Sequence, residues 1–296
     1  MVVETMSAMS ETSAKAELRR LQSLGWDAPA AGADGVRWLA RDETEISYPR
    51  DVLDTLSGDG GEGFWLDARA DAVGELLRDA SISKIWEVGA GSGAMAKRLP
   101  AYGVDVLSVE PLPEGAREIA HLGSEVFCGT LQDLALPSGS LPAVGMFDVL
   151  EHLEDPSDLL REVARVLCPI GTLVVTVPAY QWLWSAEDEA LGHFRRYSAT
   201  TLRALLARSQ FSVLSVRYCF ASLVPAAALL RALPYRLGRR HASDEVLIDI
   251  STNLNPGARL NHWAERVLAL EAKASRRVPL PFGLSVLAVA HNPPSG

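Results

Sequence analysis

A glycine-rich turn between an apolar run and a helical pattern constrains this chain more than any other feature. Lys84–Val88 has the composition of a strand, Glu87–Gly93 places glycine at three alternating positions, and Gly93–Leu99 begins a helix. Glycine lacks a Cβ, so the backbone can turn sharply there and approach a ligand closely. The N-terminus of the following helix favours the negative end of a ligand. Such a turn also occurs without a ligand, so it needs support from the rest of the chain.

Strand and helix patterns alternate around this turn. Strand patterns cover Val104–Val109, Glu125–Cys128, Ala143–Asp148, Gly171–Val177, Phe211–Tyr218 and Leu284–Ala290. Helical patterns cover 64–79, Glu114–His121, Pro156–Leu167, Thr200–Arg208 and Leu260–Val278. This order predicts an α/β fold with a Rossmann-like, mostly parallel sheet, helices on both faces, and an α-rich lid and C-terminal addition.

The patterns divide the chain into three regions. Residues 1–46 form an N-terminal tail and a stretch of uncertain role, with one short helical pattern. Residues 47–220 form the Rossmann-like domain, and 179–197, rich in Trp, His, Arg and acidic residues, reads as a lid over its site. Residues 221–296 form a helical addition that returns to the core.

Composition narrows the partners. The 296 residues carry a net charge of -9, which disfavours binding to nucleic acid phosphates and favours a small-molecule or carrier-linked acceptor. The three cysteines lie far apart, form no zinc motif and suit a reducing cytoplasm. The longest apolar stretch, Cys219–Leu230, is too short to span a bilayer. We therefore expect a cytoplasmic protein.

An acidic residue ends the strand that follows the glycine turn. Glu110 closes Val106–Glu110, where a carboxylate can accept hydrogen bonds from both hydroxyls of a ribose. This combination predicts a ligand that contains a nucleoside. A nicotinamide cofactor is the rival to an adenosyl cofactor, but the chain offers no nicotinamide site.

Several motifs in order resemble the class I S-adenosylmethionine-dependent methyltransferase family, in particular a bacterial subgroup of the methyltransferase type 11 kind. The glycine turn and Glu110 match its first two motifs, Gly129–Gln132 is similar to its adenine-binding segment, and Phe147–Pro156 resembles its "DVLEHL-DP" block. The resemblance implies S-adenosylmethionine as cofactor and S-adenosylhomocysteine as product. It implies cofactor contacts from Glu87, Gly89, Ala90, Gly91, Gly93, Glu110, Pro111, Thr130, Leu131, Gln132 and Phe147.

This chain departs from the family pattern at one position and matches the subgroup in one further segment. The family often has Asp where this chain has Thr130, so backbone amides or Gln132 could take over the adenine contact. Before the first strand, Trp65 and Arg69 match an "F-W-x-x-x-R" segment of the subgroup, which implies that they cover the cofactor and that Arg69 meets its carboxylate. A buried aromatic pair beside a salt-bridged arginine is the alternative reading.

The acceptor site is predicted in the lid and in the turn after Ala143–Asp148. His193 suits a general base, with Asp188 to orient it, and His152 is a second catalytic candidate. Trp184, Asp188, Arg195, Arg196 and Tyr197 are the candidates for binding the acceptor. The alternative is that these side chains only fasten the lid.

The spacing of Asp148, Glu151 and His152 would place all three on one helical face, where they could ligate a divalent metal. Hydrogen bonds that hold the turn are the simpler explanation, and we expect no metal.

The sequence thus predicts methyl transfer to an O or N atom of a small-molecule, secondary-metabolite or glycan-type acceptor. The alternative is a non-catalytic S-adenosylmethionine-binding protein that docks to a membrane or partner through residues 221–240, which combine an apolar run with four arginines. The sequence does not address the oligomeric state.

Overall fold

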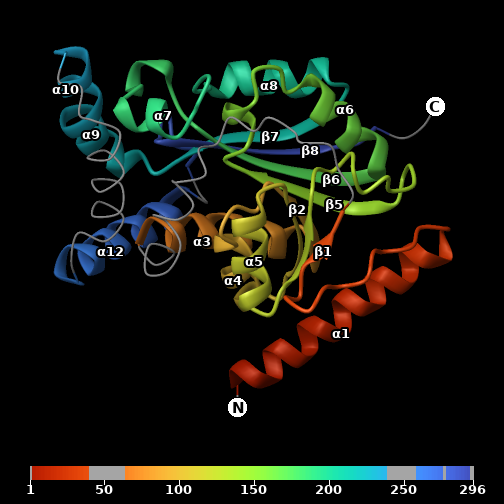
Figure 1. Cartoon of the computed structure of the whole chain (residues 1–296). Coiled ribbons are helices and arrows are strands. Elements are labelled where there is room, and N and C mark those ends of the chain that lie inside the picture. Colours follow the sequence, from red (N-terminus) through yellow and green to blue (C-terminus); the bar gives the residue numbers. More distant parts are fainter. Residues whose placement is uncertain (1, 40–63, 239–257, 276–277, 294–296) are drawn as a thin grey trace.

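A sheet of eight strands runs through the computed structural model, which describes residues 2–39, 64–238, 258–275 and 278–293 (Figure 1). The strand order is β1-β4-β3-β2-β5-β6-β8-β7. The strands are β1 (Arg37–Trp38), β2 (Lys84–Val88), β3 (Asp105–Glu110), β4 (Glu125–Cys128), β5 (Leu141–Phe147), β6 (Leu167–Pro178), β7 (Ser212–Cys219) and β8 (Ser285–His291).

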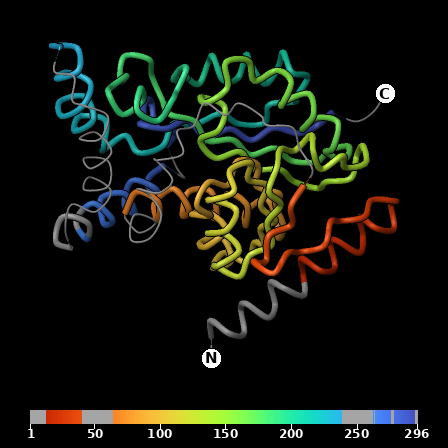
Figure 2. Tube along the Cα trace, viewed as in Figure 1, coloured from red at the N-terminus to blue at the C-terminus, as the bar shows by residue number. Residues whose placement is uncertain are grey.

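The sheet is parallel except for β8. Parallel pairing joins β1 to β4, β4 to β3, β3 to β2, β2 to β5 and β5 to β6. β8 lies between β6 and β7 and runs antiparallel to both, although it is distant from them in sequence (Figure 2). The carboxyl ends of β2 to β7 therefore meet at one edge, where open α/β sheets bind their ligands.

Helices cover both faces of the sheet (Figure 1). The longer ones are α1 (Val2–Ser23), α3 (Phe64–Asp79), α5 (Pro113–His121), α6 (Ser157–Val166), α8 (Ala199–Arg208) and α12 (Ala258–Ser275). Short helices are α4 (Ala94–Arg98), α7 (Ala186–Ala190), α9 (Val224–Ala227) and α10 (Leu233–Arg236). The predicted fold class is confirmed. The predicted elements are found within a few residues of their expected ends, except for α1, because the sequence predicts a helix only over Ala14–Leu24.

Alternation along β2 separates two cores. Trp86 and Val88 pack in a cluster with α6 and α8, whereas Ile85 packs with α3 and α4 on the opposite face. Successive side chains of a strand point to opposite faces, so a buried parallel strand reads as a continuous apolar run. The exception is Glu87, which is buried on the face of Ile85.

The N-terminal region has a structural role that its sequence did not reveal. Helix α1 begins at Val2, well before the expected Ala14, and β1 extends the sheet beside β4. Between them Trp26 packs its ring against Trp86 and Phe127, and its Nε1 donates a hydrogen bond to the Leu134 carbonyl over 2.6 Å.

The segment after β7 is helical as far as the structure describes it. Helix α9 continues through a π-helical turn, Ala228–Ala232, into α10. Arg239 and Arg240 of the predicted basic group lie outside the described residues. Among the described helices, none has the length and apolar character needed to cross a bilayer.

Candidate functional site

The glycine loop after β2 needs the left-handed conformations that glycine adopts without strain. Gly89 and Gly91 have φ angles of 73° and 58°. A Cβ on Gly89 would lie 2.8 Å from Val149 Cγ2, so a side chain has no room there. A Cβ on Gly91 would meet no atom within 4 Å. The loop therefore packs through Gly89 and presents Gly91 to open space, as a ligand cradle requires.

Glu110 at the end of β3 holds this loop. Its side chain is buried, one carboxylate oxygen accepts from the Gly91 amide over 2.7 Å, and the other accepts from the Leu112 amide over 2.7 Å. Helix α5 approaches closely, because a Cβ on Gly115 would lie 2.4 Å from the Gly91 carbonyl oxygen. The residue predicted to meet a ribose thus also fixes the loop that would face the ligand.

Charged groups lie buried beside the loop. Arg69 of α3 forms an ion pair with Asp148, whose other oxygen accepts from Thr176 Oγ1 over 2.9 Å. Arg69 Nε and Glu87 Oε2 are buried and have no hydrogen-bond partner among the described residues. Burial raises the pKa of Glu87 to about 8; the charge of Arg69 opposes this shift and that of Glu110 adds to it.

These orphaned groups fit S-adenosylmethionine. Its amino-acid end carries one ammonium and one carboxylate, so it needs one acceptor and one donor at close range. A buried carboxylate oxygen and a buried guanidinium nitrogen without partners are costly unless a ligand pairs with them. Glu87 and Arg69 would hold that end of the cofactor, and Glu110 its ribose.

The remaining cofactor candidates lie on several different elements. Pro111 follows Glu110 and Ala90 is buried in the loop. Leu131 and Phe147 are buried in the two cores, and Gln132 is exposed. Trp65 packs edge-on against Phe220 with ring centroids 4.6 Å apart.

Asp133 is a residue that the sequence argument missed. Its Oδ2 accepts from both the amide and the hydroxyl of Thr130 over 2.7 Å. The family often has a carboxylate at position 130. Here Asp133, three residues later, places its carboxylate beside the backbone of Thr130. A Thr-x-x-Asp spacing is the signal that could have found it.

The lid places His193 against a buried carboxylate. Asp188 of α7 is fully buried, His193 Nδ1 lies 2.8 Å from its Oδ1, and Arg196 Nε donates to the same oxygen over 2.7 Å. Burial works to raise the pKa of the Asp188 carboxyl, but the hydrogen bond from His193 and the charge of Arg196 outweigh it and lower that pKa. Asp188 therefore remains ionised and orients both partners.

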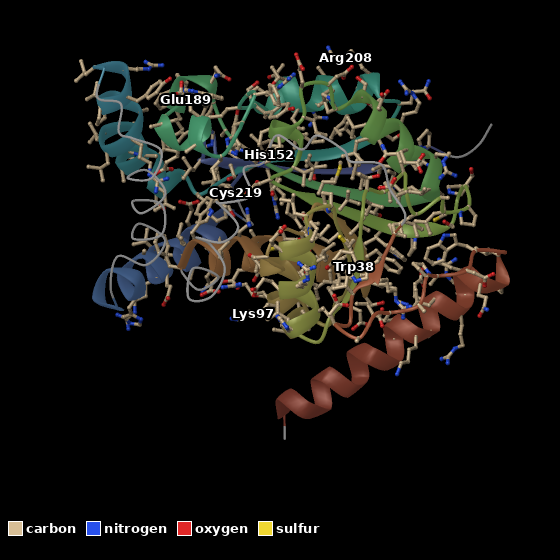
Figure 3. All side chains as sticks on the ribbon, viewed as in Figure 1. Trp38, Lys97, His152, Glu189, Arg208 and Cys219 are labelled. Carbon is tan, nitrogen blue, oxygen red and sulfur yellow. The ribbon has the colours of Figure 1, made fainter. Side chains whose placement is uncertain are left out.

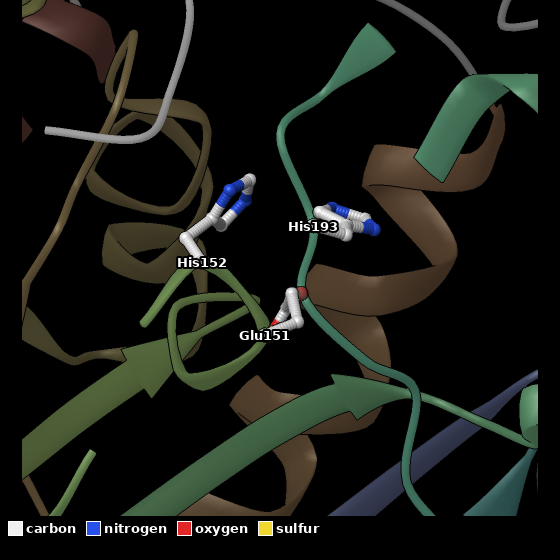
Figure 4. Close-up of side chains that lie close together, drawn as sticks. All are labelled: Glu151, His152 and His193. Carbon is white, nitrogen blue, oxygen red and sulfur yellow. The ribbon is translucent and has the colours of Figure 1, made fainter. Parts of the chain in front are cut away.

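His152 and Glu151 approach His193 from the turn after β5. The two imidazole centroids are 4.6 Å apart at 76°, although the residues come from two distant stretches of chain (Figure 4). His152 lies among the elements of the upper half of the view in Figure 3, and burial, with the charge of His193, lowers its pKa to about 3. Glu151 is fully buried, and burial together with the charge of Asp148 raises its pKa.

The other lid candidates hold the lid in place. Arg195 Nη2 donates to the carbonyls of Leu153 and Glu154. Tyr197 is buried and its hydroxyl donates to the Leu150 carbonyl over 3.2 Å. Trp184 is partly buried. Of the predicted acceptor residues, the structure brings Asp188 and Arg196 together with His193, whereas Arg195 and Tyr197 bind backbone next to them.

Backbone strain marks the same edge of the sheet. Asp148, directly after β5, and Tyr180, just after β6, both have a φ of 59°. Non-glycine residues adopt this conformation at a cost and are often found at functional sites. The sequence carries no signal for these two positions, because neither residue is glycine.

Comparison with known proteins now identifies the class. A family model described as a methyltransferase domain matches residues 59–216, more than half of the chain. The chain therefore belongs to the class I S-adenosylmethionine-dependent methyltransferase family, whose cofactor is S-adenosylmethionine. The predicted family and cofactor are confirmed.

Relatives and solved structures agree with this class. An uncharacterized methyltransferase of Mycobacterium tuberculosis is 33% identical over 41% of this chain and 47% of its own length. A probable S-adenosylmethionine-dependent methyltransferase of the same species is 30% identical over 51% of this chain and 56% of its own. The chain spans about half the length of the curated relatives it matches.

One solved structure supports the fold. A chain in the complex between the Haloferax volcanii Trm112 methyltransferase activator and a methyltransferase is 18% identical, has a TM-score of 0.52, and is matched over 83% of this chain and 98% of its own length.

Proposed function

We propose that this protein transfers the methyl group of S-adenosylmethionine to an oxygen or nitrogen atom of a small-molecule acceptor. One observation carries the proposal: a cofactor cradle after β2 and β3 shares a sheet edge with a histidine that a buried carboxylate orients after β6. Methyl transfer needs these two sides, one for the methyl donor and one for the acceptor.

The cofactor supplies an activated methyl group on a sulfonium. The chain has to position both reactants and assist the loss of the acceptor proton. Asp188 binds Nδ1 of His193, which leaves Nε2 available, and the His152 ring lies beside it. We assign His193 and His152 to the acceptor, and Glu110, Glu87 and Arg69 to the cofactor.

Two observations support the proposed class of acceptor: the net charge of the chain and the name of one relative. The net charge of -9 disfavours nucleic acid. A relative named as a ubiquinone biosynthesis O-methyltransferase of Xanthomonas oryzae is 30% identical over 36% of this chain and 48% of its own length, which supports oxygen as acceptor atom. We propose a hydroxylated metabolite of the secondary-metabolite or glycan type, in the cytoplasm, where the free thiols of Cys128, Cys168 and Cys219 are stable.

A pair of variants tests the two-sided site. His193→Ala should leave S-adenosylmethionine affinity unchanged by calorimetry and lower turnover by about 10²–10⁴-fold, because only the acceptor side is affected. Glu110→Ala should weaken cofactor binding by about 1–3 kcal/mol, because it removes a buried charged acceptor. Turnover is measured as S-adenosylhomocysteine release with a panel of phenols and hydroxylated glycosides. Full turnover by folded His193→Ala would refute the assignment.

A second proposal concerns peripheral contact with a membrane. The segment from the π-helical turn to the residue after α10 exposes Leu229, Leu230, Leu233 and Leu237, and Leu230 is the most exposed of them, at 75%. Arg231 pairs with Glu187 over 2.8 Å and the Tyr235 hydroxyl bonds Glu189, so the segment is attached to the lid helix α7. Four arginines and no acidic residue occur within 221–240, which suits an anionic surface.

Vesicle sedimentation tests this contact. The protein should sediment with phosphatidylglycerol vesicles at physiological salt, and Leu230→Ser with Leu237→Ser should abolish it. Leu214→Ser changes a leucine that is 57% exposed on β7 and should have no effect. Equal sedimentation of all three proteins, or of none, would contradict the proposal.

A further inference from the structure

Glu151 is a fully buried carboxylate of the acceptor side that forms no ion pair among the described residues. Asp148 pairs with Arg69 and Asp188 with Arg196. Glu151 is 0% exposed and neither of its oxygens has a hydrogen-bond partner in the described part of the chain. A buried carboxylate without a counter-charge is strongly unfavourable, so Glu151 either keeps its proton or pairs with a bound cation.

Two imidazoles stand beside that carboxylate, each held from behind. His193 Nδ1 bonds Asp188, and His152 hydrogen-bonds the backbone of Leu191. Histidines that bind metals use one ring nitrogen as ligand and donate the other N–H to a carboxylate or carbonyl, which fixes tautomer and direction. Both histidines therefore have the arrangement of oriented ligands.

We propose that Glu151, His152 and His193 bind one divalent transition-metal ion of the zinc type. One ligand atom from each residue lies within 4.8 Å of the others. Ligand atoms ~2.1 Å from a tetrahedral Zn²⁺ are ~3.4 Å apart, so closure requires movements of about 1 Å. Two nitrogens and one oxygen suit such an ion better than Mg²⁺ or Ca²⁺, which favour oxygen ligands.

This set differs from the one weighed in the sequence. There Asp148 was the third candidate, but Arg69 and Thr176 occupy its oxygens. His193 takes that place, because the Phe194 amide donates to the Glu151 carbonyl over 2.7 Å and brings the lid against the turn. The proposed site departs from our expectation from the sequence, which was that Asp148, Glu151 and His152 hold the turn by hydrogen bonds and bind no metal.

Three protein ligands leave a position open for a further ligand, as in catalytic zinc sites. In the proposed reaction that position would take the acceptor hydroxyl and lower its pKa, so that its proton leaves to solvent more easily. His193 and His152 would then act as metal ligands and not as general bases. This role rests on the proposed function, whereas metal binding itself does not.

Metal titration tests the site without any acceptor. Protein freed of metal with EDTA should bind one equivalent of Co²⁺, with an absorption band in the visible, and Zn²⁺ should displace it. Glu151→Gln and His193→Ala should each weaken binding by ~100-fold or more, and Asp188→Asn, which removes the support of His193, by ~10–100-fold.

The control variant is His262→Ala. His262 lies 3.7 Å from Glu265, and both are exposed, so this pair is the kind of surface site that binds metal weakly. One equivalent should remain in this variant. Absence of stoichiometric binding, or undiminished binding in Glu151→Gln, would overturn the proposal. Circular dichroism on the same metal-free proteins checks that they are folded. Calorimetry with S-adenosylmethionine shows whether the cofactor binds independently of the metal.

Discussion

At the residue scale, two carboxylates on the cofactor side differ in what holds them. Glu110 accepts two backbone hydrogen bonds, so its charge is compensated before any ligand arrives. Glu87 is buried with an oxygen that lacks a partner in the described residues. Glu110 therefore stabilises the loop. The burial of Glu87 without a partner lowers the stability of the cofactor-free protein, and the ammonium group of the bound cofactor would offset that loss.

This difference gives a pH-dependent prediction for Glu87→Gln. The pKa of Glu87 rises from 4.5 to about 8 on folding, so between these values the folded state binds more protons than the unfolded state. Stability therefore falls as pH rises through that window. Glu87→Gln has no titrating group at this position, so it does not lose stability in this way as pH rises. It should raise the unfolding free energy of the cofactor-free protein by about 1–3 kcal/mol at pH 8 and by much less at pH 5.

Urea unfolding at the two pH values measures this gain. Glu110→Gln is the matched control and should destabilise the protein at both, because it disturbs carboxylate hydrogen bonds already made. A gain for Glu87→Gln that is equal at pH 5 and pH 8 would contradict a raised pKa.

Motifs with a local mechanism were predictable at this scale, and contacts across the fold were not. Gly89, Gly91 and Glu110 follow from a strand, a turn and the next strand, which local sequence reveals. The approach of His193 to His152 depends on how the lid folds over β5, and no spacing in the sequence encodes it.

At the element scale, the connection from α1 to β1 shows how a loop-like sequence can carry a core residue. Trp26 stands in a Gly-, Ala- and Pro-rich stretch without periodicity, so the sequence offered no reason to place it inside. Its ring closes one face of the sheet over Trp86 and Phe127. The periodic helices and strands, by contrast, were predicted because their pattern is itself the signal.

Two substitutions of Trp26 separate packing from hydrogen bonding. Trp26→Ala should lower the unfolding free energy by about 3–5 kcal/mol, because it empties a buried aromatic site. Trp26→Phe should cost about 1–3 kcal/mol, because the Leu134 carbonyl loses its donor. Leu24→Ala, at a leucine that is 50% exposed, should change stability little. Thermal unfolding followed by circular dichroism gives all three values, and a neutral Trp26→Ala would show that this connection is dispensable.

At the scale of the whole molecule, the antiparallel strand β8 joins β6 to the edge strand β7. Leu287 is 1% exposed and packs in the same cluster as Ile85 of β2 and Val174 of β6. On the opposite face, Ala288 of β8 packs in one cluster with Val88 of β2 and Tyr197 of the lid, so β8 connects the cofactor side to the lid side and we expect a single unfolding transition.

The variant Leu287→Ala tests whether the protein unfolds in a single transition. It should lower the unfolding free energy by about 2–5 kcal/mol and shift cofactor-loop and lid probes together in urea. Leu270→Ala on α12 removes a leucine that is 69% exposed and should have little effect. Separate transitions for the two probes would show two independent folding units.

The position of β8 also sets an order of events in time. The pairs β2–β3, β3–β4 and β5–β6 join strands that are close in the chain, whereas β8 must find β6 across a long stretch, which is slower. The lid begins at Ala179, whose amide donates to the Leu284 carbonyl over 2.8 Å, so the start of the lid is anchored once β8 has been inserted. A refolding chain should therefore gain affinity for the methyl donor first and become able to receive its second substrate only after a lag.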